Sequence, residues 1–418
     1  MHSLVLLAAV SAAFGVPLDE PKKFTDYRLI SAEAITAECF RAAEELEGRG
    51  IVDLWSHGAP EKGTILFSVA PENYDEVKST FARFGTKLNI LERDLQKLIE
   101  KDQIGSTYSA YASDRPFSFN QFETYEQIVA SLNYYNKSNL LPVINVFSIG
   151  QTVEKREIYG VRISNSTANK SVIFIECGIH AREWASTSTC LFIIDRLIRF
   201  PKVHKALLDK YEFHIVPSSN PDGYVYTHTS NRLWRKNRSR QARGCFGVDL
   251  NRNFRAGPHC GVGTSQDSCS DIFCGTAPFS EPETAALERY ISKLHSRIDY
   301  YVSLHSFGLM WMFPYSHTHD KCPDHADLLR RAKIGVDHIA NNFGSKYVYG
   351  PIATTIYDVT GSSIDWAYMT QNITKSFVLE LQPGLDFQWG GRGFLLDKSR
   401  IIPTGLETLG GLKAMWLS

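Results

Sequence analysis

The 418-residue sequence has no excess charge of either sign, since 45 Lys and Arg residues balance 45 Asp and Glu residues. Without a basic excess, the chain lacks the electrostatic field that favours nucleic acid or an anionic membrane surface as a partner. It also lacks internal repeats and low-complexity segments, which argues against a solenoid or an extended disordered protein. Its apolar content of 43% is ordinary for a globular protein with a substantial core.

Long hydrophobic runs are also scarce. After the N-terminus no segment approaches the roughly 20 apolar residues that span a bilayer, so we expect no membrane anchor. The run Leu4–Val10 is short, and the small residues Ala13 and Gly15 fit a signal-peptidase site, although no Lys or Arg precedes the run. We therefore expect residues 1–15 to be a signal peptide and the protein to be secreted and extracellular.

Cysteine occurs eight times, but no Cys-x-x-Cys pair is present. This absence argues against a structural zinc site made of cysteines. Eight cysteines and five Asn-x-Ser/Thr sequons agree with an oxidising compartment, in which disulfides form and N-glycans are permitted. Asn237 lies inside a candidate active-site motif, where we expect no glycan. The five sequons begin at Asn136, Asn165, Asn169, Asn237 and Asn372.

The most informative motif is His-x-x-Glu, formed by His180 and Glu183. It directly follows the apolar run 171–177, which is typical of a buried strand. Open α/β sheets bind ligands in the crevice at the carboxyl ends of their strands, and imidazole and carboxylate groups are metal ligands. On its own the motif is also compatible with a turn of a surface helix, because so short a pattern occurs by chance.

Two further strand-like runs supply residues that support a metal site. Residues 298–304 end at His305, and residues 375–380 end their apolar part at Glu380. A catalytic zinc ion takes three protein ligands and keeps a fourth position for water, and two histidines with one glutamate are a standard set. Glu380 then remains as a general base that removes a proton from water. The expected ligands are His180, Glu183 and His305.

The chain reads as two units. Residues 16–110 contain segments in the order βαββαβ, with the first helix at 32–46, and predict a small α+β open sandwich. In residues 111–418 strand-like runs alternate with helical ones as far as a last helix at 404–416. This alternation predicts an α/β fold with a large mixed sheet flanked by helices.

Seven separated motifs resemble, in the same order, those of secreted zinc metallocarboxypeptidases of the pancreatic carboxypeptidase A/B type, in their preproenzyme form. The resemblance implies an activation propeptide at 16–110 that caps the cleft of a catalytic domain at 111–418. It also implies an activating protease, peptide and protein substrates with a free C-terminus, and a monomer. The motifs are Gly178–Trp184, Asn220–Tyr224, Leu233–Ser239, Val248–Asn253, Thr354–Tyr357, Ser363–Trp366 and Ile401–Thr404.

The resemblance implies a hydrolytic site with one zinc ion. In it Glu380 is the general base, and Arg238 stabilises the oxyanion that forms at the scissile carbonyl. Asp249 accepts the free ring N–H of His180 and so increases the basicity of this ligand.

A second set of residues is implied to recognise the C-terminal residue of the substrate. A guanidinium can bond both oxygens of a terminal carboxylate at once. Ile364 stands where enzymes for basic residues have an acid, so the resemblance implies an apolar pocket and release of C-terminal aromatic and aliphatic residues. The implied substrate-binding residues are Arg182, Asn251, Arg252, Ser306, Tyr357 and Ile364.

The cysteines follow the B-type members of the family, and this leaves the specificity open to alternatives. Phe307 replaces a common Tyr, Ser316 stands where A-type members tend to have Gly, and Ser362 replaces a common Gly, so B-type or mixed specificity remains an alternative. Other readings are a catalytically inactive, peptide-binding homologue and a metalloendopeptidase. The implied disulfides are Cys177–Cys190, Cys245–Cys269 and Cys260–Cys274, which leave Cys39 and Cys322 as thiols.

Overall fold

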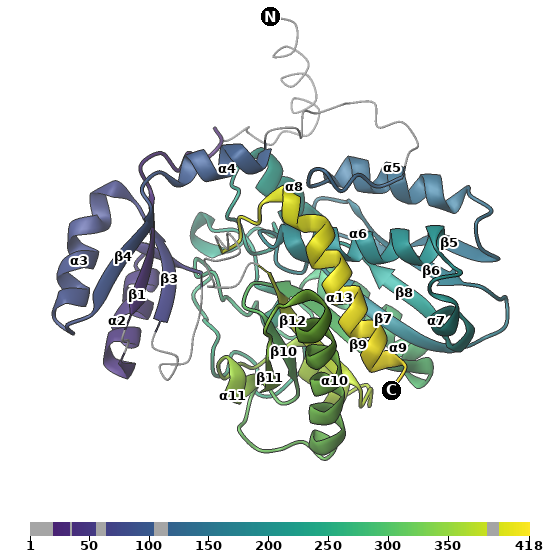
Figure 1. Ribbon diagram of the computed structural model, residues 1–418. Coiled ribbons are helices and arrows are strands. Elements are labelled where there is room, and N and C mark those ends of the chain that lie inside the picture. The colour runs from purple at the N-terminus through teal and green to yellow at the C-terminus, as the bar shows by residue number, and fades with distance from the viewer. Residues whose placement is uncertain (1–19, 34–35, 56–63, 104–115, 383–392) are drawn as a thin grey trace, which may run out of the picture.

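In the computed structural model the described part of the chain forms two sheets, one of four strands and one of eight, each packed against helices (Figure 1). The expected signal peptide and the expected boundary near residue 110 lie outside the described part of the chain. The structure describes residues 20–33, 36–55, 64–103, 116–382 and 393–418.

The smaller sheet belongs to the N-terminal unit and has the strand order β2-β3-β1-β4 with antiparallel neighbours. Its chain order is βαββαβ, as expected, and a further helix, α4, leads towards the larger unit. The elements are β1 (Arg28–Glu33), α2 (Ala37–Gly48), β2 (Val52–Leu54), β3 (Thr64–Val69), α3 (Tyr74–Ala82), β4 (Lys87–Glu92) and α4 (Leu95–Gln103).

The first helix begins later than the expected residue 32. Ala32 is still part of β1, where it pairs with Ile65 of β3. The helix starts after Thr36, whose side chain caps it by accepting a hydrogen bond from the backbone N–H of Cys39 at 3.2 Å. Helical spacing of apolar residues did not distinguish the end of the strand from the first turn, whereas the Thr cap marks the start.

Alternation along β1 and β3 gives the small sheet two apolar faces. Ile30 and Phe67 belong to the core under α2 and α3. Leu29 and Leu66 lie on the opposite face, in a cluster that also contains Phe307 of the larger unit. Because successive side chains of a strand point to opposite faces, one face stabilises the small unit and the other docks it.

The larger sheet is mixed, as expected, with the strand order β11-β10-β12-β9-β7-β8-β6-β5. The strands β12, β9, β7 and β8 are parallel, whereas β10 and β6 run antiparallel to their neighbours in this block. The strands are β5 (Val143–Gln151), β6 (Glu157–Ser164), β7 (Ser171–Cys177), β8 (Tyr211–Val216), β9 (Ile298–Ser306), β10 (Met310–Phe313), β11 (Val348–Pro351) and β12 (Ser376–Leu381).

Helices cover both faces of this sheet, because its central strands are apolar on both sides. Ile173 and Ile175 of β7 pack in the core with α5, α6, α10 and α13, whereas Val172 and Phe174 pack in the core with α9 and α12 (Figure 1). The helices are α5 (Tyr125–Asn136), α6 (Trp184–Arg199), α7 (Lys205–Lys210), α8 (Pro221–Thr229), α9 (Pro282–Leu294), α10 (His325–Phe343), α11 (Ile352–Thr355), α12 (Ser363–Met369) and α13 (Ile401–Trp416).

The last helix, α13, begins at Ile401, three residues before the expected start. Pro403 lies in its first turn, where the missing N–H costs no hydrogen bond. The structure contains the three implied disulfides, Cys177–Cys190, Cys245–Cys269 and Cys260–Cys274, and Cys39 and Cys322 are buried thiols.

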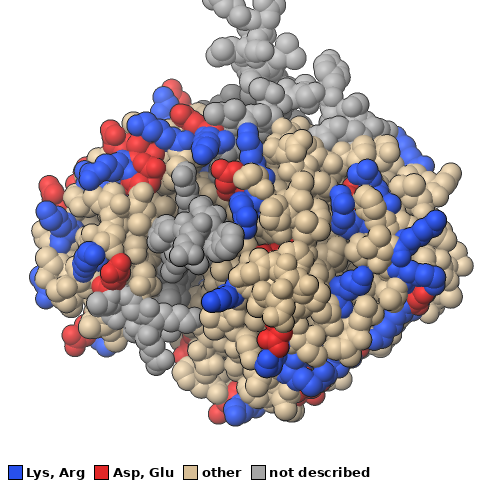
Figure 2. Space-filling model, viewed as in Figure 1, with Lys and Arg blue, Asp and Glu red and all other residues tan. Residues whose placement is uncertain are grey.

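Basic and acidic side chains are interspersed over the face shown in Figure 2. In the described part of the chain, no helix has the length and apolar character that a bilayer crossing requires.

Candidate metal and peptide-binding site

The ends of two parallel strands, β7 and β9, bring the expected metal ligands together, and a third strand, β12, adds Glu380. His180 and Glu183 lie in the turn between β7 and α6, and His305 is the penultimate residue of β9. Gly178 opens that turn with a φ of 66°, a conformation that glycine adopts at little cost. Glu380 lies on β12 directly beside His305 in the sheet register. Three separate segments thus contribute to a single cluster at one edge of the sheet.

The ligand atoms of this cluster are spaced as a tetrahedral metal site requires. The Nδ1 atom of His180 lies 2.7 Å from Oε1 of Glu183 and 3.2 Å from Nδ1 of His305. The same His305 nitrogen lies 3.2 Å from Oε2 of Glu183. Zinc–nitrogen bonds are about 2.0–2.1 Å long, so neighbouring ligand atoms of a tetrahedral site lie about 3.3 Å apart. All three residues are buried, and they fit one zinc ion.

The electrostatics of the cluster favour a positive charge between these side chains. Burial raises the pKa of Glu183, but His180 and His305 outweigh it and hold this pKa well below its usual range. Burial lowers the pKa of His305, yet Glu183 raises it to about 9. The ionised Glu183 carboxylate therefore attracts a proton to Nδ1 of His305, the nitrogen that would bind a metal cation. Protons and metal ions compete for such ligands.

Glu380 lies beside the cluster and remains available for proton transfer. Burial raises the pKa of its carboxyl to about 8, against the opposing influence of His305. Within the described residues, its Oε2 atom is shielded from solvent and has no hydrogen-bond partner. A carboxylate with a raised pKa and an uncommitted oxygen can accept a proton near neutral pH.

Asp249 connects the cluster to Arg235. Its Oδ1 atom lies 3.1 Å from Nε2 of His180, and its Oδ2 atom accepts hydrogen bonds from Nε and Nη2 of Arg235 at 3.0 and 2.8 Å. Burial raises the pKa of Asp249, but Arg235 and Arg252 hold it well below its usual value. The ionised carboxylate can therefore orient the His180 ring from the side opposite Nδ1.

The position expected for the oxyanion donor is not occupied by Arg238. That guanidinium lies 3.6 Å from the ring centre of Tyr226 and 4.6 Å from that of Phe246, outside the cavity lining. Arg235, three residues earlier, is buried, lines the cavity and has its Nη1 atom 3.9 Å from Glu183. The expectation of Arg238 is therefore corrected, because only Arg235 reaches the cluster. Sequence reasoning missed it because three basic residues share this loop.

The residues expected to bind a substrate carboxylate lie together on the cavity wall. Asn251 and Arg252 belong to a short 3-10 helix, Leu250–Arg252, in which the Asp249 side chain accepts from the N–H of Asn251. The Nη2 atom of Arg252 lies 3.4 Å from the hydroxyl of Tyr357. Asn251 is held in turn because its Oδ1 accepts from the N–H of Ser363 at 2.9 Å. Three polar groups thus face one region of the cavity.

One side of the cavity is apolar. The cavity encloses about 460 Å³, and Ile364 lines it, as expected. Ser316 does not line it. Its hydroxyl lies behind the wall, within hydrogen-bond distance of Asp365 and of Ser362. Ser362 reaches the cavity, but its oxygen also accepts from the N–H of Asp365. The apolar lining residues here are Met310, Met312, Ile352, Ile356, Val359, Ile364 and Val378.

The N-terminal unit closes another side of the same cavity. Arg182 lines the cavity but faces this unit, donating to Asp53 at 2.9 Å and lying 4.2 Å from the ring centre of Phe394. Trp55 packs on Phe394 with ring centres 5.4 Å apart. Ser306 lines the cavity as well, and its N–H donates to Glu183 at 3.1 Å. Arg182 is therefore engaged by the N-terminal unit instead of an open substrate site.

Comparison with known proteins agrees with this geometry. The sequence profile of the family described as zinc carboxypeptidase matches residues 135–411, and that of the carboxypeptidase activation peptide matches residues 30–102. Mast cell carboxypeptidase A of Homo sapiens is 36% identical over 87% of this chain and 86% of its own length. Carboxypeptidase B of Rattus norvegicus is 34% identical over 98% of this chain and 97% of its own length.

A solved structure extends the similarity to the whole fold. The crystal structure of thrombin activatable fibrinolysis inhibitor superposes with a TM-score of 0.83 and 31% sequence identity, covering 94% of this chain and 98% of that one. Both units of the present chain therefore have counterparts in one known fold. The chain belongs to the zinc carboxypeptidase family and carries the activation peptide of that family in its N-terminal unit.

Proposed function

We propose that this chain is the secreted zymogen of a zinc exopeptidase that releases C-terminal aromatic and aliphatic residues from peptides and proteins. In this proposal residues 1–15 are a signal peptide, 16–110 an inhibitory propeptide and 111–418 the catalytic domain. The observation that carries the proposal is one cavity that holds a three-ligand metal cluster, an uncommitted carboxylate and a basic wall beside an apolar one.

The proposed chemistry divides between the metal and the side chains. Zinc, when bound by His180, Glu183 and His305, supplies a Lewis acid that polarises water and the scissile carbonyl. Glu380 removes a proton from the attacking water and returns it to the leaving amine, a role supported by its raised pKa. Arg235 stabilises the developing oxyanion, supported by its burial and its fixed position on Asp249.

Recognition of a free C-terminus is assigned to Asn251, Arg252 and Tyr357. Arg252 is buried, and burial strengthens a charge-assisted hydrogen bond to a carboxylate. The Tyr357 hydroxyl near Nη2 of Arg252 supports a shared contact with the same anion. An internal peptide bond offers no such carboxylate, so this wall favours an exopeptidase over an endopeptidase.

The apolar wall supports a preference for apolar terminal residues. No acidic group that could pair with a C-terminal Lys or Arg reaches this wall among the residues that line the cavity near Ile364. The hydroxyl of Ser362 already takes part in internal hydrogen bonds, which makes it a poor partner for a polar side chain. Discrimination among apolar residues is expected to be soft, because a methylene group contributes only about 1–3 kcal/mol in such a pocket.

The experiment that tests this function uses the activated enzyme and a set of peptides that differ only in the last residue. We expect rapid release of Phe and Leu, slow release of Lys and Glu, and no release from the C-terminally amidated peptide. A zinc chelator should abolish release, and added zinc should restore it. Fastest release of Lys or Arg would contradict the specificity, whereas equal cleavage of the amidated peptide would contradict the exopeptidase assignment.

A further inference from the structure

The five sequons have no part in the proposed chemistry, but their Asn residues differ in how far they are exposed to solvent. Asn136, Asn169 and Asn372 are exposed, Asn165 is half-buried, and Asn237 is fully buried. An N-glycan is attached to the side-chain amide nitrogen and needs open space around it. We propose that the secreted protein carries N-linked carbohydrate at Asn136, Asn169 and Asn372, and that Asn237 remains unmodified.

The three exposed sequons meet the demands of a bulky polar group. Asn136 is the last residue of α5. Its amide oxygen accepts from the N–H of Val146 at 2.8 Å, so the hydrogen bond does not involve Nδ2, the atom to which a glycan is attached. Asn169 precedes β7 in an exposed turn. Asn372 has a φ of 55°, a left-handed conformation that Asn tolerates, in the turn before β12.

Asn237 is excluded because every polar atom of its amide has a partner inside the protein. Its Nδ2 atom donates to Glu281 at 2.7 Å and to Glu283 at 3.0 Å. Its oxygen accepts from the backbone N–H of Val248 at 2.8 Å. A sugar on Nδ2 would have to fit into a space without solvent exposure, so a chain modified there could not complete this fold.

Asn165 is not included in the proposal, since both ends of its amide are engaged. Its Nδ2 atom donates to Asp209 at 2.8 Å, and its oxygen accepts from Lys170. It lies four residues before Asn169 in the same connection between β6 and β7 and provides a matched comparison for that site.

Asn169 and Asn372 lie on one side of the large sheet, because each closely precedes a strand of the parallel block, β7 or β12. Asn136 is separated from the site in another way, because it contacts Val146 of the edge strand β5, and β6, β8 and β7 lie between β5 and β9. His305 and Glu380 lie at the opposite ends of the parallel strands. At about 3.3 Å per residue, β7 alone separates the two edges by about 20 Å. Carbohydrate at Asn169 and Asn372 would thus lie at the edge remote from the cavity, and carbohydrate at Asn136 would lie beside the edge strand farthest from β9 on that side of the sheet.

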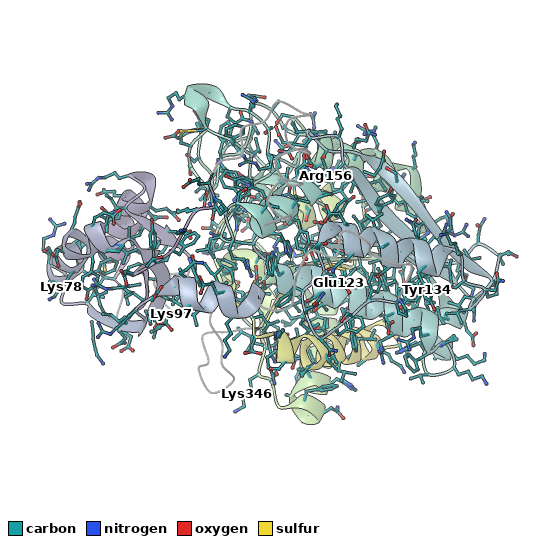
Figure 3. All side chains as sticks on the ribbon, turned by 90° about the horizontal axis from the view of Figure 1, so that it is seen from above. Lys78, Lys97, Glu123, Tyr134, Arg156 and Lys346 are labelled. Atoms are coloured by element: carbon teal, nitrogen blue, oxygen red, sulfur yellow. A yellow bond between two sulfur atoms is a disulfide. The ribbon has the colours of Figure 1, made fainter. Side chains whose placement is uncertain are left out.

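Figure 3 supports this separation for the first site. Tyr134, two residues before Asn136 on α5, lies at the end of the molecule away from the N-terminal unit, which Lys78 and Lys97 mark. Because the N-terminal unit closes the cavity, carbohydrate at Asn136 would not cover the substrate site.

The test is peptide mapping of the full chain secreted from glycosylating cells, after treatment with an amidase that converts each glycosylated Asn to Asp. We expect conversion at Asn136, Asn169 and Asn372 and an unchanged Asn237 in the folded protein. Conversion of Asn237 in folded, active protein, or no conversion at the three exposed sites, would overturn the proposal.

A second measurement tests the sidedness of glycosylation, that is, whether the three glycans lie away from the cavity. Replacing Asn136, Asn169 and Asn372 together by Gln should leave peptide hydrolysis by the activated enzyme within about twofold of wild type, because surface substitutions have small effects. As the matched control, Lys346→Asn with Val348→Thr creates a sequon at the cavity rim, where Val348 is 54% exposed. Its glycan should slow hydrolysis of a protein substrate at least tenfold until it is removed enzymatically. A tenfold or greater rise in hydrolysis of the protein substrate by the triple variant, which lacks these three glycans, would show that they cover the cavity and would contradict the sidedness.

Discussion

At the scale of single residues, the proposed mechanism depends most on Glu380. Glu380→Gln keeps the shape of the side chain but cannot accept a proton, so kcat of the activated enzyme should fall by about 10²–10⁴. The thermal midpoint should not fall, because the substitution removes a carboxyl group whose ionised form is disfavoured by burial. Steady-state kinetics and differential scanning calorimetry check both points. An unchanged kcat would rule out Glu380 as the general base.

Arg235 and Arg238 form a matched pair for the oxyanion role. Arg235→Lys should lower kcat by about 10²–10³, since loss of a donor to the oxyanion costs that much. Arg238→Lys changes a side chain of the same type in the same loop, but one that contacts aromatic rings, so kcat should stay near wild type. The kcat values of the two activated variants decide between them, and the reverse order would restore the original expectation of Arg238.

The sequence allowed part of this site to be predicted and not the rest, for physical reasons. His180, His305 and Glu380 follow or end apolar runs, and parallel strands bring their carboxyl ends to one edge. No such rule applies to the loop that contains Arg235 and Arg238. Which of them enters the cavity depends on the loop path, and Asp249, fourteen residues further along the chain, fixes Arg235 by two hydrogen bonds to its Oδ2 atom.

At the scale of elements, the start of α9 contains two buried carboxylates, Glu281 and Glu283, around Asn237. Burial raises the pKa of Glu283 from its ordinary 4.5 to about 7, and Asp222 and Glu281 add to this rise. The folded state therefore binds a proton that the unfolded chain releases between these values. The free energy of unfolding should fall by about 3 kcal/mol as pH rises from about 4.5 to about 7 and then level off.

Glu283→Gln isolates this contribution, because its amide oxygen can still accept from Asn237. Urea unfolding monitored at several pH values should show a variant that loses less stability than wild type between about pH 4.5 and 7. Glu288→Gln, at a half-buried position of the same helix away from Asn237, serves as the control and should follow the wild-type profile. Identical profiles for Glu283→Gln and wild type would contradict the assignment.

The elements were more predictable than their boundaries. Strand β7 agrees with the expected range 171–177, because its run of apolar residues and the Gly178 turn mark its end. The first helix was expected too early, since Ala32 suits a helix as well as a buried strand. Only its pairing with Ile65, which is distant in sequence, decides between them.

At the scale of the whole molecule, the interface between the two units controls access to the cavity. The order of strands and helices in the N-terminal unit was predictable, but the pairing of Arg182 with Asp53 was not, because it joins residues 129 positions apart. Arg182 was expected to contact substrate, and in this form of the protein it contacts the activation peptide instead.

Trp55→Ala should weaken this interface, because Trp55 is 4% exposed and fills the space next to Phe394. Truncation of a central interface Trp costs about 2 kcal/mol or more, so the full-length proenzyme should hydrolyse a small peptide roughly tenfold faster or more. Tyr74→Ala removes a ring from the opposite, helix-covered side of the same unit and should change turnover little. Equal rates for the two variants would contradict the role of the interface.

The zinc content of the purified protein tests the central claim most directly. Plasma mass spectrometry should find one zinc ion per chain in the wild type and in His317→Asn, a histidine outside the cluster. His305→Asn removes one of the three ligands and should lose both the ion and peptidase activity. A His305→Asn protein that retains one zinc ion per chain, or an active wild-type enzyme without zinc, would contradict the account.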